Sequence, residues 1–234
     1  MATVTDLRRI LNLKRLIILF VVNLFNDIIP ISLFLSLKET AVTQNGLYYL
    51  FDRYFCTNIG ILAFAQFISF YGFIVFCVVD RIREDNQKYG IFYLVRYSRL
   101  HYVFGKFASS VIFLFFVCAF STAQSYLSHR LMRITVSGEQ YTTILALSFL
   151  IAFSGAQTAL FVYSLLNNPN LSFLCFAAIL TAFSVIFSVK KLTVPTPNNI
   201  PIEYIYPFIL ALALTVLNFL VMFKNDFITT KIKE

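Results

Sequence analysis

Long hydrophobic segments separated by short polar ones make up most of the chain. Six of these segments are each long enough to cross a hydrocarbon core of roughly 30 Å as a helix. Between the fourth and the fifth lies Asn167-Asn168-Pro169-Asn170, and Asn and Pro residues favour a tight turn between two helices. We expect the membrane spans at about residues 16–37, 58–79, 107–127, 142–166, 171–189 and 207–223.

A short basic stretch, residues 1–15, precedes the first hydrophobic segment. The pattern predicts an interfacial entry helix. The charged start of a signal peptide is the alternative, but residues 16–37 are longer than the apolar core of such a peptide and no small-residue cleavage site follows them. One side of the entry helix would carry Leu7, Ile10, Leu11 and Leu13, and the other Arg8, Arg9, Lys14 and Arg15.

The composition agrees with a membrane location. Hydrophobic residues make up 59% of the 234 residues and charged residues 13%, whereas a soluble domain carries about 25% charged residues. We therefore expect an all-α membrane protein, with residues 1–234 forming a single transmembrane domain. In such a protein a net charge of +8 reflects orientation and contact with anionic lipid, so we expect membrane lipid and no nucleic acid among its partners.

Basic residues are distributed unevenly between the two sets of polar segments. Of the 19 Lys and Arg residues, thirteen lie in the N-terminal stretch, the central polar segment and the C-terminal tail, and six in the other segments. Because basic residues accumulate on the cytoplasmic side, this bias places both termini and the central segment in the cytoplasm. The chain would then be a multi-pass protein of the cell membrane.

The central polar segment, residues 80–106, holds six of those basic residues. As a helix, its middle part would place Ile91, Leu94 and Val95 on one side, displaced from Arg96 and Arg99. This is a basic amphipathic helix at a membrane surface. It either only fixes the topology or is presented to a cytoplasmic partner.

The same segment contains Arg83-Glu84-Asp85, Gly90, Arg96-Tyr97-Ser98-Arg99 and Gly105-Lys106. In the spacing of these residues it resembles the ABC-2 type permease family, the membrane subunits of one large class of ABC exporters. Two positions depart from the family pattern: Ile91 stands where Thr is usual and Tyr97 where Pro is common.

The resemblance implies the ABC-2 exporter fold, with a coupling helix between spans two and three that docks in a groove of an ABC ATPase subunit. It also implies a second permease subunit, in a homodimer or heterodimer, and a bacterial plasma membrane. The chain contains no GxxxxGK[ST] sequence, so we expect no enzyme activity and no cofactor here, with ATP and Mg on the partner ATPase. The expected coupling residues are Gly90, Tyr93, Leu94, Arg96, Ser98 and Arg99.

Polar residues inside the spans are the other candidates. Asn23, Asn26 and Asp27 share one helical face with Pro30, and an intramembrane carboxylate is costly enough to suggest function. With Gln66 they form either part of a substrate path or a helix-packing cluster. Single amides in later spans predict interhelical hydrogen bonds, namely Gln124, Gln157 and Asn218.

The leading hypothesis is therefore an exporter subunit for an amphipathic substrate, with antimicrobial or toxic peptides first by resemblance and lipids or drugs next. A stand-alone immunity protein or channel is the alternative. An intramembrane enzyme is disfavoured, because the chain has neither HExxH nor GxSxG. No catalytic or metal residues are expected, since Cys56, Cys77, Cys118 and Cys175 show no paired spacing. Residues 190–207 form either an external loop or a re-entrant segment.

Overall fold

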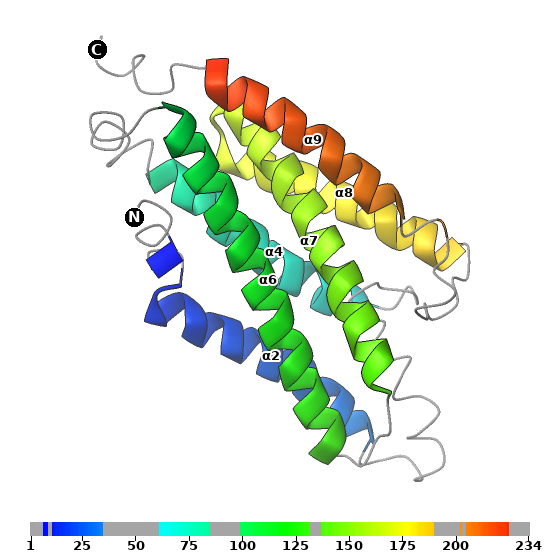
Figure 1. Ribbon diagram of the computed structural model, residues 1–234. Coiled ribbons are helices and arrows are strands. Elements are labelled where there is room, and N and C mark those ends of the chain that lie inside the picture. The colour runs from blue at the N-terminus through cyan, green and yellow to red at the C-terminus, as the bar shows by residue number, and fades with distance from the viewer. Residues whose placement is uncertain are drawn as a thin grey trace.

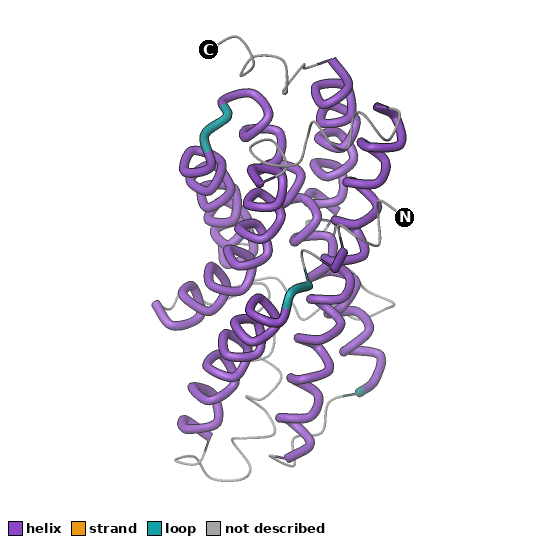
Figure 2. Tube along the Cα trace, turned by 90° about the vertical axis from the view of Figure 1, so that its left-hand side faces the viewer, coloured by secondary structure: helices purple, strands orange, loops and turns teal. Residues whose placement is uncertain are grey.

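The computed structural model describes residues 7–8, 11–34, 61–84, 99–131, 137–189, 202 and 205–224. This part of the chain is helical and contains no strand, which confirms the all-helical prediction for these residues (Figures 1 and 2). Its long helices are α2 (Leu13–Phe34), α4 (Ile61–Glu84), α6 (Arg99–Leu131), α7 (Gly138–Leu166), α8 (Pro169–Val189) and α9 (Ile205–Lys224).

Each predicted hydrophobic segment coincides with one of these helices, but two helices continue into the central polar segment. Helix α4 runs on to Glu84 instead of ending at residue 79, and α6 begins at Arg99 instead of residue 107. Apolar residues continue among the charges here, and Ile82 and Val103 are buried. Amphipathic turns of this kind extend a helix beyond the purely hydrophobic run.

Successive helices run in alternating directions (Figure 1). The start of one helix therefore lies beside the end of another at the same end of the bundle. The start of α2 meets the end of α4 through Arg15 and Asp80. The end of α4 meets the start of α6 through Arg81 and Lys106. Pro169 and Asn170, at the start of α8, line a groove with Asp80. We call this end the basic end.

Helix α7 is the centre of the bundle and packs against α4, α6, α8 and α9. Buried residues occur all along it, from Tyr141 to Ser164. Its contact with α8 is close because Gly155 has no side chain: a Cβ atom there would lie 2.5 Å from Cε2 of Phe176. Small residues of this kind let helix backbones approach one another in membrane proteins.

Both ends of α7 are capped, the start by side chains and the end by the backbone N–H of Asn167, which donates to the Tyr163 carbonyl at 2.8 Å. Ser137 and Gln140 form a reciprocal capping box at its start. At its end Asn167 adopts a left-handed conformation with φ 48°, and Asn168 Oδ1 accepts the backbone N–H groups of Asn170 and Leu171 to start α8. The predicted tight turn is confirmed.

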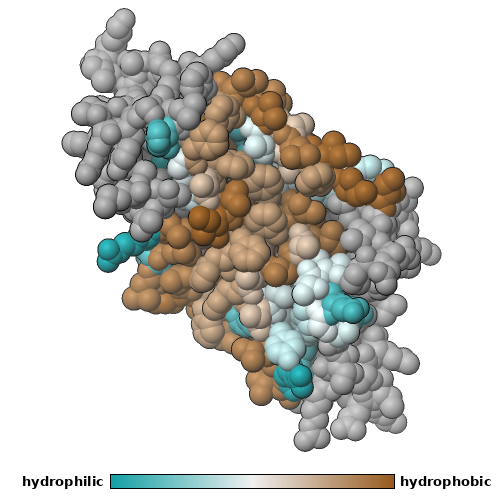
Figure 3. All heavy atoms as spheres, viewed as in Figure 1, coloured by the Kyte–Doolittle hydropathy of each residue, from teal (hydrophilic) through white to brown (hydrophobic). Residues whose placement is uncertain are grey.

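Among the residues that the structure describes, two helices are long and apolar enough to cross a membrane, His101–Leu131 and Gly138–Leu166. Shorter apolar stretches occur in α8 and α9, at Pro169–Phe183 and Ile205–Val221. Hydrophobic side chains cover the middle of the face in Figure 3, while hydrophilic ones gather toward the ends of the helices. The exposed large hydrophobic residues include Ile112, Phe115, Phe116, Leu174, Ile209, Leu212 and Val216.

Candidate functional site

The basic end of the bundle holds an ion pair between α2 and α4. Arg15 Nη2 lies 2.7 Å from Asp80 Oδ2, and both side chains are mostly buried. Arg83 lies one turn further along α4, 3.6 Å from the other carboxylate oxygen, and is far more exposed. Asn12 caps the first turn of α2, because its Oδ1 accepts the backbone N–H of Arg15. The cap fixes the helix start that carries this arginine.

A second polar contact joins α4 to α6. The side chain of Arg81 is only 1% exposed, although a guanidinium is costly to bury unless polar groups surround it. Its Nη1 donates to Ser110 Oγ at 3.2 Å, and Nη1 and Nη2 both lie 3.4 Å from the Lys106 carbonyl oxygen. Ser109 and Ser110 donate to that same carbonyl. Arg81 therefore shares this carbonyl with two serine hydroxyls in the first turns of α6.

Lys106 is itself buried, at 3% exposure. Its ammonium nitrogen lies 5.2 Å from the centre of the Tyr102 ring, one turn earlier on α6. At this distance the ring attracts the cation and offsets part of its lost hydration. Two basic side chains, Arg81 and Lys106, are thus withdrawn from the surface at the facing ends of α4 and α6.

We refer to Arg15, Asp80, Arg81, Lys106 and Ser110 as the arginine cluster. It links three helices, α2, α4 and α6, at one level of the bundle. Two of those helices end on either side of residues 85–98, because α4 ends at Glu84 and α6 begins at Arg99. The arginine cluster therefore joins, by polar contacts, the two helix ends that flank this connection.

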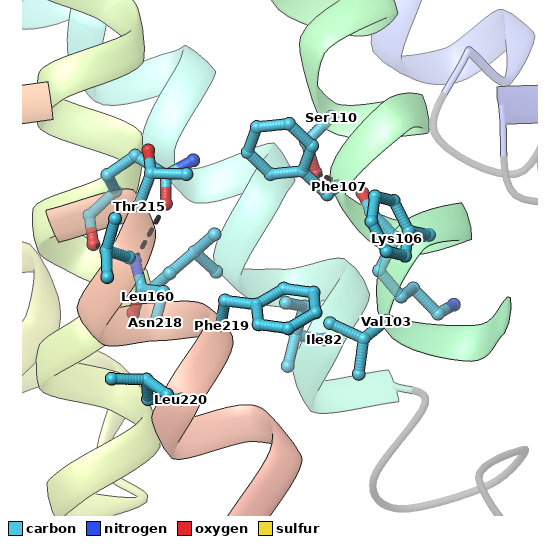
Figure 4. Close-up of a pocket in the computed structure, with 13 residues that line it drawn as sticks. Ile82, Val103, Lys106, Phe107, Ser110, Leu160, Thr215, Asn218, Phe219 and Leu220 are labelled. Atoms are coloured by element: carbon cyan, nitrogen blue, oxygen red, sulfur yellow. Dashed lines mark hydrogen bonds between the residues drawn. The ribbon is translucent and has the colours of Figure 1, made fainter. Parts of the chain in front are cut away.

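A cavity of about 370 Å³ lies beside the arginine cluster, between α4, α6, α7 and α9 (Figure 4). On the α6 side its wall includes Lys106, Phe107 and Ser110, and on the opposite side it includes the end of α9. Most of the lining is apolar. The remaining lining residues are Ile82, Val103, Phe104, Gln157, Leu160, Thr215, Val216, Asn218, Phe219 and Leu220.

Asn218 crosses from α9 to α7 at the wall of this cavity. Its Nδ2 donates to the backbone oxygen of Gln157 at 2.8 Å and to the side-chain oxygen of the same residue at 2.7 Å. Both acceptors are oxygens, so this orientation of the Asn218 amide is fixed by its partners. The interhelical hydrogen bonds predicted for these two amides are confirmed.

The predicted substrate-path residues are only partly described. Asn23 is fully buried and its Oδ1 accepts from Ser121 Oγ at 3.1 Å, which joins α2 to α6. Asn26 and Asp27 lie in α2, and Gln66 lies in α4; their side chains are outside the described part of the structure. The Asn23 contact has the geometry of helix packing.

Among the predicted coupling residues, Arg99 is the first residue of α6. The others lie outside the described residues: Gly90, Tyr93, Leu94, Arg96 and Ser98. Sequence reasoning missed the arginine cluster, because Arg81 was counted only as a charge that sets the topology and Lys106 only as such a charge and as part of the Gly105-Lys106 motif. The sequence did carry a signal for Arg81, because the apolar residues Val78 and Ile82 lie within one turn of it. Both are buried, so this turn of α4 faces inward.

At the opposite end of the bundle, His129 and Tyr141 join α6 to α7 through a contact of 2.7 Å between Nδ1 and the phenol oxygen. Within the described residues, no group of three His, Cys, Asp or Glu side chains is placed to hold a metal ion. Three cysteines there are free, Cys77, Cys118 and Cys175. No protein-family model, curated protein or solved structure matches the chain.

Proposed function

We propose that this chain is the membrane subunit of an ABC-2 type exporter, driven by a separate ATPase. In this proposal all six helices cross the membrane and the basic end faces the cytoplasm with both termini. Residues 85–98, together with Arg99, contain the coupling helix. ATP and Mg²⁺ are handled by the partner ATPase, and a second permease subunit completes the transport unit.

The arginine cluster is the observation that carries this proposal. An exporter must convert the opening and closing of an ATPase into movement of membrane helices. A connection between two helices transmits such movement only when the two helix ends that flank it are held rigidly. Here Arg81 joins the end of α4 to the start of α6, and Arg15 joins the same end of α4 to α2. The two helix ends that flank the connection are therefore expected to move as one unit.

The surface supports the membrane location. Large hydrophobic side chains are exposed along several helices, such as Phe115 on α6, Leu174 on α8 and Ile209 on α9. A soluble monomer rarely exposes a contiguous apolar patch of more than a few hundred Å². Meanwhile buried polar groups such as Arg81 and Asn218 face other helices, which is the arrangement that a lipid solvent requires.

The proposed substrate is amphipathic, with antimicrobial or toxic peptides first and lipids or drugs as the neighbouring classes. A purification experiment tests the coupling role. The chain is purified from its native membrane in mild detergent, and copurifying P-loop ATPase, ATP hydrolysis and transport are measured together. Arg96→Glu with Arg99→Glu adds like-charge repulsion, which at an interface costs several kcal/mol, so the ATPase is lost or runs uncoupled from transport.

The matched control is Lys231→Glu with Lys233→Glu, which changes the net charge equally but lies in the C-terminal tail. This control retains the ATPase and transport. A double reversal at Arg96 and Arg99 that keeps a full complement of ATPase and wild-type transport contradicts the coupling role. Absence of any stoichiometric ATPase in the wild-type preparation favours the stand-alone immunity protein or channel instead.

A further inference from the structure

A groove of about 420 Å³ lies between α4 and α8 at the basic end. Its lining residues fall within 75–83 on α4 and 169–174 on α8, and they differ from those that line the cavity beside the arginine cluster. Further from the basic end the two helices touch, because Gly72 has no side chain: a Cβ atom there would lie 3.4 Å from Cε2 of Phe173. The groove therefore lies between this helix contact and the basic end.

The groove is charged at one end and apolar at the other. Asp80 and Arg83 line it near the end of α4, and Asn170 lines it at the start of α8. Phe76 and Leu174 line it nearer the middle of the bundle, and both are exposed. At a rise of about 1.5 Å per residue, Phe76 lies about 10 Å from Arg83 along α4. This order of walls matches a lipid whose head group lies at the bilayer surface and whose chain points inward.

The charged end of the groove carries an excess of positive charge. Asp80 alone would repel an anion, but Arg15 pairs with its carboxylate at 2.7 Å, which leaves the charge of Arg83 in excess. Glu84 is the next carboxylate on α4; it does not line the groove, and neighbouring residues of a helix do not share a face. The net charge beside the groove therefore favours an anionic ligand.

Arg83 is the side chain that can contact such a ligand. Its side chain is 46% exposed, and its Nη2 lies 3.6 Å from Asp80 Oδ1, which is too long for a hydrogen bond. Asp80 therefore does not fix the direction of its donors, and a guanidinium binds phosphate through paired N–H groups. The start of α8 contributes less, because Asn168 Oδ1 already accepts the backbone N–H groups of Asn170 and Leu171.

We propose that this groove binds a phospholipid with a net negative head group. Its phosphate lies against Arg83, and one acyl chain lies along Phe76, Phe173 and Leu174. Charge complementarity selects the anionic class, since a zwitterionic head group brings a cation of its own to the positive end of the groove. The inference rests on the membrane location of the chain and not on the proposed export function.

Tryptophan fluorescence tests the proposal, because the chain contains no Trp. Phe76→Trp places a reporter on the wall of the groove, and Ile209→Trp places one on the exposed apolar surface of α9. Each full chain is reconstituted in mixed vesicles of phosphatidylglycerol and phosphatidylcholine, with bromine on the acyl chains of one lipid or of the other. Bromine quenches tryptophan on contact, so the quenching gives the relative affinity of the two lipids beside each reporter.

We expect phosphatidylglycerol to bind roughly three- to tenfold more tightly than phosphatidylcholine in Phe76→Trp, as one basic residue beside an anionic lipid provides. Ile209→Trp shows no such preference. Arg83→Gln in the Phe76→Trp background abolishes the preference. Lys14→Gln is the matched control: it removes the same charge from an exposed residue of α2 at the basic end, outside the groove lining, and keeps the preference.

Equal affinities of the two lipids in Phe76→Trp overturn the proposal, and so does a preference that Lys14→Gln abolishes as fully as Arg83→Gln, because diffuse surface charge then explains it. A preference that survives Arg83→Gln overturns the role of Arg83. Quenching of Ile209→Trp with none of Phe76→Trp means that protein, and not lipid, covers the groove. These outcomes leave the export proposal intact, whereas quenching of neither reporter overturns the membrane location itself.

Discussion

Arg15 Nη2 and Asp80 Oδ2 lie 2.7 Å apart although 65 positions separate them in the sequence. Each belongs to the last or first turns of a long helix, and each side chain keeps only a small exposed fraction. The pair therefore fixes where α2 begins relative to where α4 ends. Asp80 also lies near Arg83, so its carboxylate is within ion-pair distance of two guanidinium groups at the basic end.

Removing this carboxylate is expected to destabilise the protein. Asp80→Asn leaves the partly buried Arg15 without its counter-charge. We expect the free energy of unfolding to fall by about 2 kcal/mol, which lies between the cost of breaking an exposed ion pair and that of breaking a buried one. Cys77 and Cys118 are fully buried, so a thiol-reactive dye reports unfolding once Cys56 and Cys175 are replaced by Ala. The midpoint of thermal unfolding should fall.

The exchange Arg15→Asp with Asp80→Arg restores part of that loss, because the two charges again face each other. Glu139→Gln serves as the control, since this carboxylate is exposed in the first turn of α7, where a charge is worth about 0.3–1 kcal/mol. An Asp80→Asn midpoint equal to the wild-type value would show that the pair adds nothing to stability.

Gly155 and Gly138 provide a matched pair on helix α7. Gly155→Ala brings a Cβ atom within 2.5 Å of the Phe176 ring, and that ring is itself fully buried. The ring cannot move without displacing its neighbours, so we expect a destabilisation of about 1–3 kcal/mol, as other overpacked cores show. Gly138→Ala meets no atom within 4 Å and is neutral or slightly stabilising.

The same thiol assay reads both variants. Phe176→Leu combined with Gly155→Ala should recover part of the midpoint, because the smaller side chain vacates the space that the new methyl group needs. Equal midpoints for Gly155→Ala and Gly138→Ala would mean that α7 and α8 do not pack as closely as the structure describes.

The length of the apolar segments was sufficient to locate the helices, because a long apolar segment in lipid would have no hydrogen-bond partner for its backbone except itself. The turn at Asn167 and Asn168 could also be predicted, because Asn caps helices through its own side chain and backbone conformation and needs no distant partner. What the sequence could not locate was Arg81, which charge counting treats as a surface residue. Its burial depends on the Lys106 carbonyl of another helix, and such pairings arise only from tertiary packing.

Helix ends were also misjudged for a physical reason. The hydropathy of residues 99–106 falls because Arg99, His101 and Lys106 are polar, yet helix α6 includes all of them. Long basic side chains can keep their charged groups near polar partners while their stems pack against apolar neighbours. Hydropathy alone therefore places a helix end too close to the apolar run.

Thiol accessibility tests the orientation. In a background whose native cysteines are replaced, Glu139→Cys should react with an impermeant thiol reagent from outside intact cells, because the start of α7 lies at the end opposite the basic end. Glu84→Cys should react only after the membrane is permeabilised. Both positions are described, at the first turn of α7 and the last of α4. Labelling of Glu84→Cys in intact cells, with none at Glu139→Cys, would invert the topology.

Arg81 and Arg83 test whether the arginine cluster transmits movement or only adds positive charge. Arg81→Lys keeps the charge, but a single ammonium cannot reproduce the forked contacts to the Lys106 carbonyl and Ser110. Under the proposed export function, we expect normal insertion and ATPase copurification, with ATP hydrolysis uncoupled from transport. Arg83→Lys, on the same helix, changes an exposed side chain 3.6 Å from Asp80 and leaves coupling intact.

The two variants carry the same charge, so membrane orientation is matched between them and any difference comes from the contacts of Arg81. Hydrolysis and transport are measured on the same reconstituted sample, together with the midpoint of thiol-detected unfolding. Ser110→Ala removes one of the Arg81 acceptors but leaves the Lys106 carbonyl, and it should reduce coupling less than Arg81→Lys does. A wild-type ratio of transport to ATP hydrolysis in Arg81→Lys would limit the arginine cluster to a structural role. If the cluster transmits movement, loss of the forked contacts of Arg81 must lower that ratio.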